Sequence, residues 1–255
     1  MKQRWHVRIV RSALALVWLC VLPALTACRQ QPATIVYLLL DVSASTNSPA
    51  VRAEYLREAD AIAMALSQNG AAIRGDVIGT DALNNSSLPI QVDIPTYSMF
   101  NSTPEKHAKA VRQVLATLHR QVETAIQENA RAQSTPIMES LQMAQKVLNG
   151  SQFAHCEQKQ LIVFSDMVQE SSAYNFAKNP ITASQSRAVL DAEQKAHRIP
   201  DLAGVKVWKT GSSAEHLSDE RILNLQAFWI AYFRLAGADL QADRYGSSLL
   251  NYSVN

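Results

Sequence analysis

The chain has 255 residues, 47% of them hydrophobic and 18% charged, which is the composition of a globular domain with a full hydrophobic core. Its formal net charge of +2 arises in the first 28 residues, because these contain four of the 24 lysines and arginines and none of the 22 acids. The remainder is nearly neutral, which argues against nucleic acid as a partner, because a protein that binds it needs a basic surface.

Residues 1–27 have the organisation of a secretory signal peptide. Residues 1–11 are basic, and residues 12–27 form the apolar stretch SALALVWLCVLPALTA. This stretch contains Pro23 and is shorter than the ~20 apolar residues that a membrane-spanning helix needs. We therefore expect an exported chain without a transmembrane helix.

The signal ends in Leu25-Thr26-Ala27-Cys28, which resembles the lipobox of bacterial lipoproteins, where the cysteine is acylated and the peptide is cut before it. The resemblance implies a lipid anchor on Cys28 that attaches the protein to a membrane of the cell envelope, with residues 28–33 as a short tether. Arg29 favours the outer membrane of a Gram-negative bacterium over its inner membrane. The alternatives are an ordinary signal peptide with a chance cysteine and an uncleaved anchor.

The body of the chain contains one further cysteine. With Cys20 in the signal and Cys28 lipidated, Cys156 has no partner for an intramolecular disulfide. Its neighbour His155 raises the alternative of a Cys-His nucleophile. Adjacent residues in one loop rarely present both groups to one substrate, so a structural thiol is the preferred interpretation.

Hydrophobic periodicity predicts one domain over residues 34–236 and a C-terminal extension at 237–255. Continuous apolar runs such as TIVYLLL indicate buried strands, and apolar residues spaced by three or four indicate helices. The predicted strands are 34–40, 75–83, 88–94, 159–165 and 204–211, and the predicted helices are 50–68, 104–129, 136–148, 184–198 and 218–236. This order predicts an α/β fold, doubly wound, with a mostly parallel central sheet and helices on both faces.

Two of the predicted buried strands are followed by acids, Asp41 and Asp166. Ligands of such sheets bind at the carboxyl ends of the strands, so we expect both carboxylates in one crevice. Asp41 also opens the pattern D-x-S-x-S with Ser43 and Ser45. On its own this pattern is typical of a simple Asx or serine turn.

With a threonine before a predicted helix, in STPIMESL, these residues resemble the metal-ion-dependent adhesion site of von Willebrand factor A (VWA) domains. The resemblance covers about residues 34–236, and its five positions are filled in order by Asp41, Ser43, Ser45, Thr135 and Asp166. It implies that the hydroxyls bind a cation directly and that the aspartates act mainly through water. Glycines common in the family are replaced by Ala132-Gln133-Ser134 and by Met167, which alters how closely a ligand backbone can approach.

Two carboxylates and three hydroxyls suit a hard divalent cation, since Mg²⁺ takes about six oxygen ligands and usually keeps some water. Mg²⁺ or Mn²⁺ is expected rather than Zn²⁺, which prefers imidazole and thiolate ligands. The resemblance implies an open metal position that an acidic residue of a protein ligand can fill. The sequence does not identify that ligand.

Other ionisable residues have simpler interpretations. Asp76 and Asp81 flank a predicted strand; contact with the crevice is one alternative, and solvated edge positions are the preferred interpretation. The histidines lack the spacing or the partners of a metal site and are expected on the surface; they are His107, His119, His197 and His216. The aromatic run FWIAYF at 228–233 is expected to pack in the core.

The expected protein is therefore a lipid-anchored binding module, not an enzyme, and without a small-molecule substrate. A first alternative is a hydrolase or phosphoryl-transfer enzyme that uses Asp41. Ser43 stands where haloacid-dehalogenase-type enzymes have a second aspartate, and the sequence has neither G-x-S-x-G nor a glycine-rich phosphate loop. A second alternative is a structural envelope lipoprotein whose metal site is idle.

Overall fold

A computed structural model describes residues 32–43, 46, 48–79, 88–99, 102–129, 134–211, 217–249 and 252. They belong to one compact unit, which begins at Pro32. Cys28, Ser45, Asp81 and His216 lie outside the described residues.

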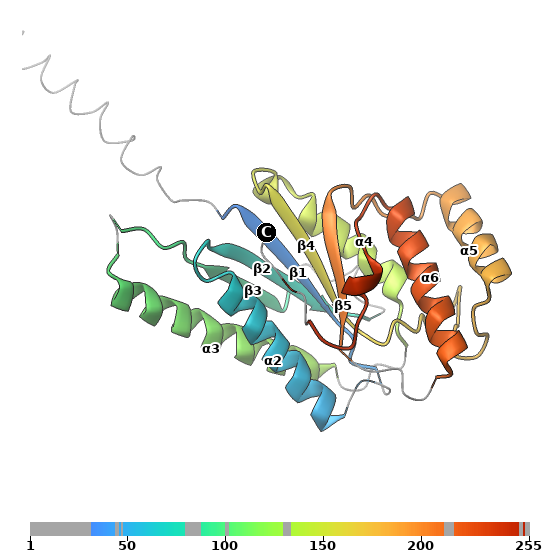
Figure 1. Ribbon diagram of the computed structural model, residues 1–255, viewed down its shortest axis with the longest axis horizontal. Helices are drawn as coiled ribbons and strands as arrows, with labels where there is room; N and C mark the ends of the chain where they lie inside the picture. The colour runs from blue at the N-terminus through green and yellow to red at the C-terminus, as the bar shows by residue number, and fades with distance from the viewer. Residues whose placement is uncertain are drawn as a thin grey trace, which may run out of the picture. The chain divides into compact units, whose positions relative to one another are not determined.

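The centre of the fold is a five-stranded sheet with the order β3-β2-β1-β4-β5 (Figure 1). Its strands are β1 (Thr34–Leu40), β2 (Ala71–Val77), β3 (Ile90–Ile94), β4 (Gln158–Phe164) and β5 (Val205–Thr210). β1 is parallel to both β2 and β4, and β4 is parallel to β5. β3 is antiparallel to β2. The sheet is thus mostly parallel, as predicted, with β1 at its centre.

Helices cover both faces of the sheet (Figure 1). One face packs against α2 (Pro49–Ala65) and α3 (Pro104–Glu128), and the other against α4 (Ile137–Leu148), α5 (Ala183–Lys195) and α6 (Asp219–Leu235). Two short 3₁₀ turns follow α4 and α6, namely η2 (Ser151–Phe153) and η3 (Ala242–Arg244). The predicted α/β class is confirmed. Within the described part of the chain, no helix is long and apolar enough to cross a membrane.

β1 is apolar at almost every position because both of its faces are covered. Side chains alternate across a strand, so Tyr37 and Leu39 enter the core under α4 and α6, while Leu38 and Leu40 enter the core under α2 and α3. All residues of β1 are buried. A polar side chain here would lose its water without gaining a partner, and the first acid, Asp41, comes only where the strand ends.

Helix boundaries follow local signals and agree with the prediction to within three residues. A serine or threonine hydroxyl caps the first turn of four helices; these residues are Ser48, Thr103, Thr182 and Ser218. Pro49 and Pro104 occupy the first helical position of α2 and α3, where a missing N–H costs nothing. Such signals are encoded in adjacent residues, so the sequence alone predicts them.

The position predicted for the second strand, 75–83, is wrong. β2 begins at Ala71 and ends at Val77, and the next two residues form a bend. Alanine has a low intrinsic strand propensity, so Ala71 and Ala72 give no local strand signal. They form a strand because Ala72 pairs with Ile35 of β1 and Ala71 pairs with Ile94 of β3. Partners distant in sequence therefore decide this strand.

The aromatic run of α6 packs in the core, as predicted. Phe228, Trp229, Tyr232 and Phe233 are each at most 1% exposed. Trp229 contacts Phe228 and Tyr232 edge to face, with ring centroids 5.2 and 5.4 Å apart. Such pairs contribute about 0.5–1.5 kcal/mol each beyond the burial of their area. α6 is therefore firmly held against the sheet.

Candidate metal centre

Asp41 and Asp166 lie at the carboxyl ends of neighbouring parallel strands. Leu40, the last residue of β1, pairs with Phe164, the last residue of β4. The N–H of Asp41 donates to the carbonyl oxygen of Phe164 over 2.8 Å, which extends the pairing by one residue. Asp41 is 1% exposed and Asp166 is 4% exposed. The two acids that were predicted at this edge of the sheet lie there, and both are buried.

Both carboxylate oxygens of Asp41 accept hydrogen bonds from the protein. Oδ1 accepts from the N–H of Ser43 over 2.9 Å, an Asx turn, and Oδ2 accepts from the hydroxyl of Ser165 over 2.7 Å. The Thr46 hydroxyl donates to the Asp41 carbonyl oxygen over 2.9 Å and lies 3.5 Å from the Ser43 hydroxyl. Ser43 and Thr46 thus both contact Asp41, and the Ser43 hydroxyl lies close to its carboxylate.

Asp166 has one oxygen held by the protein and one without a partner. Its Oδ1 accepts from the N–H of Val168 over 2.9 Å. Its Oδ2 is buried and has no hydrogen-bond partner among the described residues. A buried polar atom left unpaired costs about 1–3 kcal/mol, and more when it is charged. A cation or a water molecule at this oxygen would remove that cost.

The charge of this site calls for a counter-ion. Burial, and next the negative charge of Asp166, raise the pKa of Asp41 from 3.8 to about 6, although hydrogen bonds from Ser165 and Ser43 act in the opposite direction. A divalent cation would balance two such carboxylates, and oxygen ligands suit Mg²⁺ or Mn²⁺. Nowhere in the described part of the chain do three His, Cys, Asp or Glu side chains gather to hold a metal. A cation here would therefore depend on hydroxyls and water as well.

A buried ammonium group adds positive charge near Asp166. Lys209 of β5 is 6% exposed, and its Nζ donates to the carbonyl oxygen of Gly211 over 3.0 Å. Burial lowers the pKa of Lys209 to about 8, while the negative charges of Asp166 and Glu58 raise it. When it is protonated, Lys209 offsets part of the negative charge that a metal ion would otherwise balance.

Met167, directly after Asp166, has a backbone conformation that usually requires glycine. Its φ is +64°, a left-handed conformation that residues other than glycine rarely adopt, and its side chain is buried. Its N–H donates to the Ser165 hydroxyl over 2.9 Å, and its carbonyl oxygen accepts from Trp229 Nε1 over 2.8 Å. Hydrogen bonds therefore connect α6 through Met167 and Ser165 to the carboxylate of Asp41.

Thr135 is fixed to the loop that follows Asp166. Its N–H donates to the carbonyl oxygen of Glu170 over 3.0 Å, and the N–H of Glu170 donates back to the Thr135 carbonyl oxygen over 2.9 Å. Thr135 is 4% exposed. Gln169 strengthens the same connection, since its Oε1 accepts from the N–H of Met138, in the first turn of α4, over 3.1 Å.

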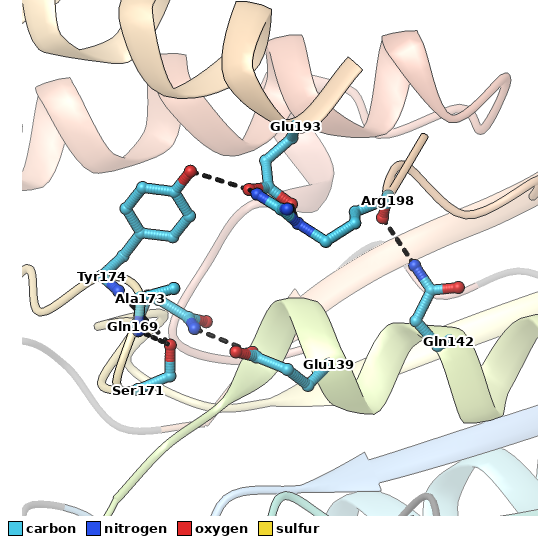
Figure 2. A network of polar contacts seen from close by, with 8 residues as sticks. All are labelled: Glu139, Gln142, Gln169, Ser171, Ala173, Tyr174, Glu193 and Arg198. Atoms are coloured by element: carbon cyan, nitrogen blue, oxygen red, sulfur yellow. Dashed lines mark hydrogen bonds and ion pairs between the residues drawn. The ribbon is translucent and has the colours of Figure 1, made fainter. Parts of the chain in front are cut away.

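Further polar contacts hold this loop between α4 and α5 (Figure 2). The amide of Gln169 donates to Glu139 of α4 over 3.0 Å, and the hydroxyl of Tyr174 donates to Glu193 of α5 over 2.7 Å. Glu193 is in turn paired with Arg198. The loop bearing Asp166 is thus held by polar contacts on both sides, to α4 and to α5.

The structure thus brings Asp41, Ser43 and Asp166 together, and ties Thr135 to the loop of Asp166. Ser45 lies outside the described residues. The sequence analysis missed the roles of three polar residues that organise the site, Thr46, Ser165 and Gln169. Only Ser165 gave a local signal, because a serine directly before a strand-end aspartate can reach the neighbouring strand end.

Two simpler interpretations of ionisable residues are wrong. Asp76 is not at a solvated edge: it lies in β2 between β1 and β3 and is 2% exposed, and burial raises its pKa to about 6. His107 is not on the surface: it is 9% exposed, and its Nε2 lies 2.9 Å from the carbonyl oxygen of Ser67. Both errors arise because the identity of a single charged or polar residue does not reveal which helices and strands cover it. His119 is partly exposed and pairs with Asp60 over 3.2 Å.

Cys156 has the surroundings of a structural thiol. It is 6% exposed, and its Sγ donates to the carbonyl oxygen of Pro32 over 3.2 Å. Burial raises its pKa, which disfavours the thiolate that nucleophilic chemistry requires. His155 Nε2 lies 3.7 Å from the sulfur, a distance at which any hydrogen bond is weak.

The sequence matches no protein-family model and no curated protein at a significant level. Similar solved structures include the pilus adhesin SpaC from Lactobacillus rhamnosus GG in its open conformation, at 15% identity and a TM-score of 0.42, over 86% of this chain and 28% of the adhesin. Manganese-loaded TRAP protein from Plasmodium vivax matches at 14% identity and a TM-score of 0.40, over 87% of this chain and 70% of TRAP. Proximal thread matrix protein 1 from the mussel byssus matches at 10% identity and a TM-score of 0.40, over 84% of this chain and 41% of that protein.

This chain therefore spans less than half of the adhesin and of the mussel protein. TM-scores below 0.5 establish no relationship, so the function is argued from the residues of the site.

Proposed function

We propose that this protein is a VWA-like binding module that holds a divalent cation between the ends of β1 and β4 and uses it to bind a protein partner. One observation carries the proposal. Asp41 and Asp166 are buried at the ends of adjacent parallel strands, and Oδ2 of Asp166 has no hydrogen-bond partner among the described residues. Such an arrangement is costly in the absence of a positive ligand.

The hydroxyls of Ser43, Ser45 and Thr135 would bind the cation directly, and the carboxylates of Asp41 and Asp166 would act on it mainly through water. When bound, the cation would supply positive charge and an open coordination position for a carboxylate of another protein. The chain's own part is to hold these oxygens in place. The hydrogen bonds from Ser165 and Ser43 fix the carboxylate of Asp41, and the pairing with Glu170 fixes the backbone of Thr135.

The surroundings of Asp41 favour binding over catalysis. An aspartate that attacks a phosphoryl group needs a free oxygen and access to the substrate. Asp41 is 1% exposed, and its two carboxylate oxygens already accept hydrogen bonds from Ser43 and Ser165. We therefore propose a protein that is not an enzyme.

The proposal includes a lipid anchor on Cys28, in the outer membrane of a Gram-negative envelope, on the strength of the lipobox resemblance. Pro32, at the start of the compact unit, is four residues from Cys28. The fold would thus be held close to the membrane surface, where adhesion to envelope or extracellular proteins takes place.

Calorimetry with Mg²⁺ and with Mn²⁺ on the full chain tests the metal site. We expect one cation per chain, and loss of at least about tenfold in affinity in Asp41→Asn and in Asp166→Asn, since each removes one of two balancing charges. Asp76→Asn is the matched control. Asp76 is also buried, and its Oδ2 also has no hydrogen-bond partner among the described residues, but burial alone raises its pKa, without a contribution from the charge of Asp41 or Asp166. Absence of binding by the wild-type chain would indicate an idle site and contradict the proposal.

The partner is tested by affinity capture from an envelope extract, using the full chain with Mg²⁺ or with a chelator. We expect capture of a protein with Mg²⁺ and its loss with the chelator or in Asp41→Ala. The control variant is again Asp76→Asn, which should capture the same protein. Capture that is indifferent to the chelator would contradict a metal-bridged contact.

A further inference from the structure

A groove lies at the edge of the sheet opposite to the candidate metal centre. α2 runs from the carboxyl end of β1 back to the amino end of β2, where Ala72 pairs with Ile35. β3 is antiparallel and ends at the same edge, with Ile94 opposite Ala71. The chain then continues to Pro104, and the start of α3 lies at the same end of the molecule as the start of β1 (Figure 1).

The groove has a volume of about 440 Å³ and is lined by the end of α2, the segment after β3 and the first turns of α3. Its lining is mostly apolar and includes Met64, Tyr97 and Leu115. His107 Nε2 lies 2.9 Å from the Ser67 carbonyl oxygen, and its ring packs against Tyr97 with centroids 5.2 Å apart. These contacts tie the walls together, so the groove is formed without a ligand. Its size is that of sites for small ligands, about 300–1,000 Å³.

The surface around the groove is apolar, whereas an ordinary solvated surface carries charged side chains. Among the described residues, four large hydrophobic side chains are exposed. Met64, 55% exposed, lines the groove, and Met99, 79% exposed, follows the lining residue Tyr97 by two positions. Residues 61–69, which form the end of α2 and the turn after it, carry no charge. Exposed apolar side chains gathered in this way mark a surface that contacts an apolar medium or partner.

Positive charge lies in the first turns of α3, which also line the groove. Lys106, Lys109 and Arg112 are exposed in the first turns of α3, where Glu105 is the one acid, and Arg112 also lines the groove. Cations at the start of a helix oppose its dipole, at a cost of about 0.3–1 kcal/mol each. This arrangement does not stabilise α3, but it adds to the positive potential of the helix N-terminus. The region is therefore complementary to a surface with anionic groups over an apolar interior.

We propose that this amino edge is a membrane-docking face: an acyl chain of a phospholipid enters the groove, and the basic residues of α3 contact anionic headgroups. The path of the chain favours a membrane over another apolar partner. The start of β1 lies at this edge, and Cys28 precedes Pro32, the first described residue, by four positions in the sequence. Four residues reach at most ~14 Å, which would hold this edge at the surface that receives the lipid.

The orientation of the amino edge towards the membrane rests on the proposed lipid anchor. In this orientation the two edges of the sheet have different functions. With the amino edge on the membrane, the candidate metal centre at the carboxyl edge points away from the lipid, where a partner protein can reach it.

The test uses tryptophan as a probe in the full chain, reconstituted with vesicles of phosphatidylethanolamine and phosphatidylglycerol that carry brominated acyl chains. Met99→Trp places the probe at the proposed face. Leu223→Trp is the matched control, because Leu223 is also an exposed hydrophobic residue, 63% exposed, but lies on α6. The wild-type chain supplies the background emission of the buried Trp208 and Trp229, and of Trp5 and Trp18 in any sample that keeps the first 27 residues.

We expect a blue shift and loss of most of the added emission for Met99→Trp, and neither for Leu223→Trp. Charge reversal at Lys106, Lys109 and Arg112, added to Met99→Trp, should restore emission, as should vesicles without the anionic lipid. Circular dichroism checks that each variant is folded. Equal quenching of both probes, or of neither, overturns the proposal. A blue shift without vesicles also overturns it, since the occupant would then be protein.

Mass spectrometry of the same samples separates this inference from the anchor. If Cys28 is acylated and the Met99→Trp probe is not quenched, the docking face is wrong and the anchor stands. If Cys28 is not acylated and the probe is quenched on anionic vesicles, the anchor is wrong and the docking face stands.

Discussion

The two edges of the sheet are built from the same strands but in opposite ways. At the carboxyl edge, Asp41 and Asp166 are buried and cross-linked by hydrogen bonds to neighbouring loops. At the amino edge, Met64 is exposed in a groove, and Met99 is exposed in the segment after β3, two residues beyond the groove residue Tyr97. At the carboxyl edge, polar residues come directly after buried parallel strands. Where such residues are themselves buried, their polar groups need hydrogen-bond partners within the protein. The comparison predicts that substitutions at the carboxyl edge change stability strongly, and those at the amino edge barely.

The largest effect is expected at Trp229, which supports the carboxyl edge from α6. Its side chain is fully buried and donates to the carbonyl oxygen of Met167. Trp229→Ala should lower the free energy of unfolding by about 3–5 kcal/mol, through the cavity it leaves. Trp229→Phe should cost about 1–3 kcal/mol, mainly for the unpaired carbonyl. Urea unfolding measures both, and Leu223→Ala on the same helix should change little.

The second effect is a dependence of stability on pH at Asp41. Its pKa in the folded protein, about 6, is above the ordinary value of 3.8, so the folded state binds the proton more tightly than the unfolded state. The contribution of Asp41 to stability is therefore full below about pH 4 and falls as the pH rises to about 6, by about 2–3 kcal/mol in all. The asparagine of Asp41→Asn cannot ionise, so in urea unfolding the free energy of unfolding of this variant should lack the decrease that Asp41 contributes over this pH range.

The pH dependence of the free energy of unfolding should change when Mg²⁺ is added, and only if the carboxyl edge binds the cation. Because the cation needs the ionised carboxylate, it should restore stability above about pH 6 in the wild-type chain and not in Asp41→Asn. Asp76→Asn should remove its own share of the pH dependence and keep the response to Mg²⁺, since the pKa of Asp76 is also raised by burial, to about 6. Unfolding curves that coincide with and without Mg²⁺ across this range would contradict the site.

A smaller effect, about 1 kcal/mol, is expected as the difference between two variants of Met167, where backbone strain and side-chain burial have opposite effects on stability. Met167→Ala should destabilise by about 2–5 kcal/mol, because it loses the buried side chain and keeps the left-handed φ. Met167→Gly loses the same side chain but relieves the strain, so it should be more stable than the alanine variant by about 1 kcal/mol. Thermal unfolding ranks the two, and the opposite order would show that the strain is negligible.

The smallest effect is expected at the amino edge. Met64→Ser and Met99→Ser remove exposed side chains, so each should change the free energy of unfolding by less than about 0.5 kcal/mol. Urea unfolding of the full chain measures this. A loss comparable to that of Trp229→Phe would show that these methionines pack against the protein, and the contrast between the edges would fail.

Much of the fold could be predicted because its signals are local. The strand TIVYLLL and the helices that begin after Ser48, Thr103 and Thr182 carry their patterns in consecutive residues. β2 could not be placed, because Ala71 becomes part of a strand only through pairing with another strand. Propensity is a weak guide where a neighbouring strand supplies the hydrogen bonds.

The two acids of the candidate site could be predicted from the sequence, but the residues that hydrogen-bond to them could not. Asp41 and Asp166 follow apolar runs, and parallel topology then implies that they meet. That Ser165 donates to Asp41, 124 positions away in the chain, is visible only in three dimensions. So is the burial of Asp76 and His107, because helices and strands distant in sequence cover them.

The sequence by itself determined the order of strands and helices and the two strand ends at which acids stand. Those features follow from periodicity and capping, which act over a few residues. Only the tertiary structure decided the environment of the groups: the raised pKa of Asp41, the unpartnered oxygen of Asp166 and the groove at the amino edge. The burial of a group and the charges around it depend on every helix and strand that packs nearby, so a local sequence pattern does not reveal them.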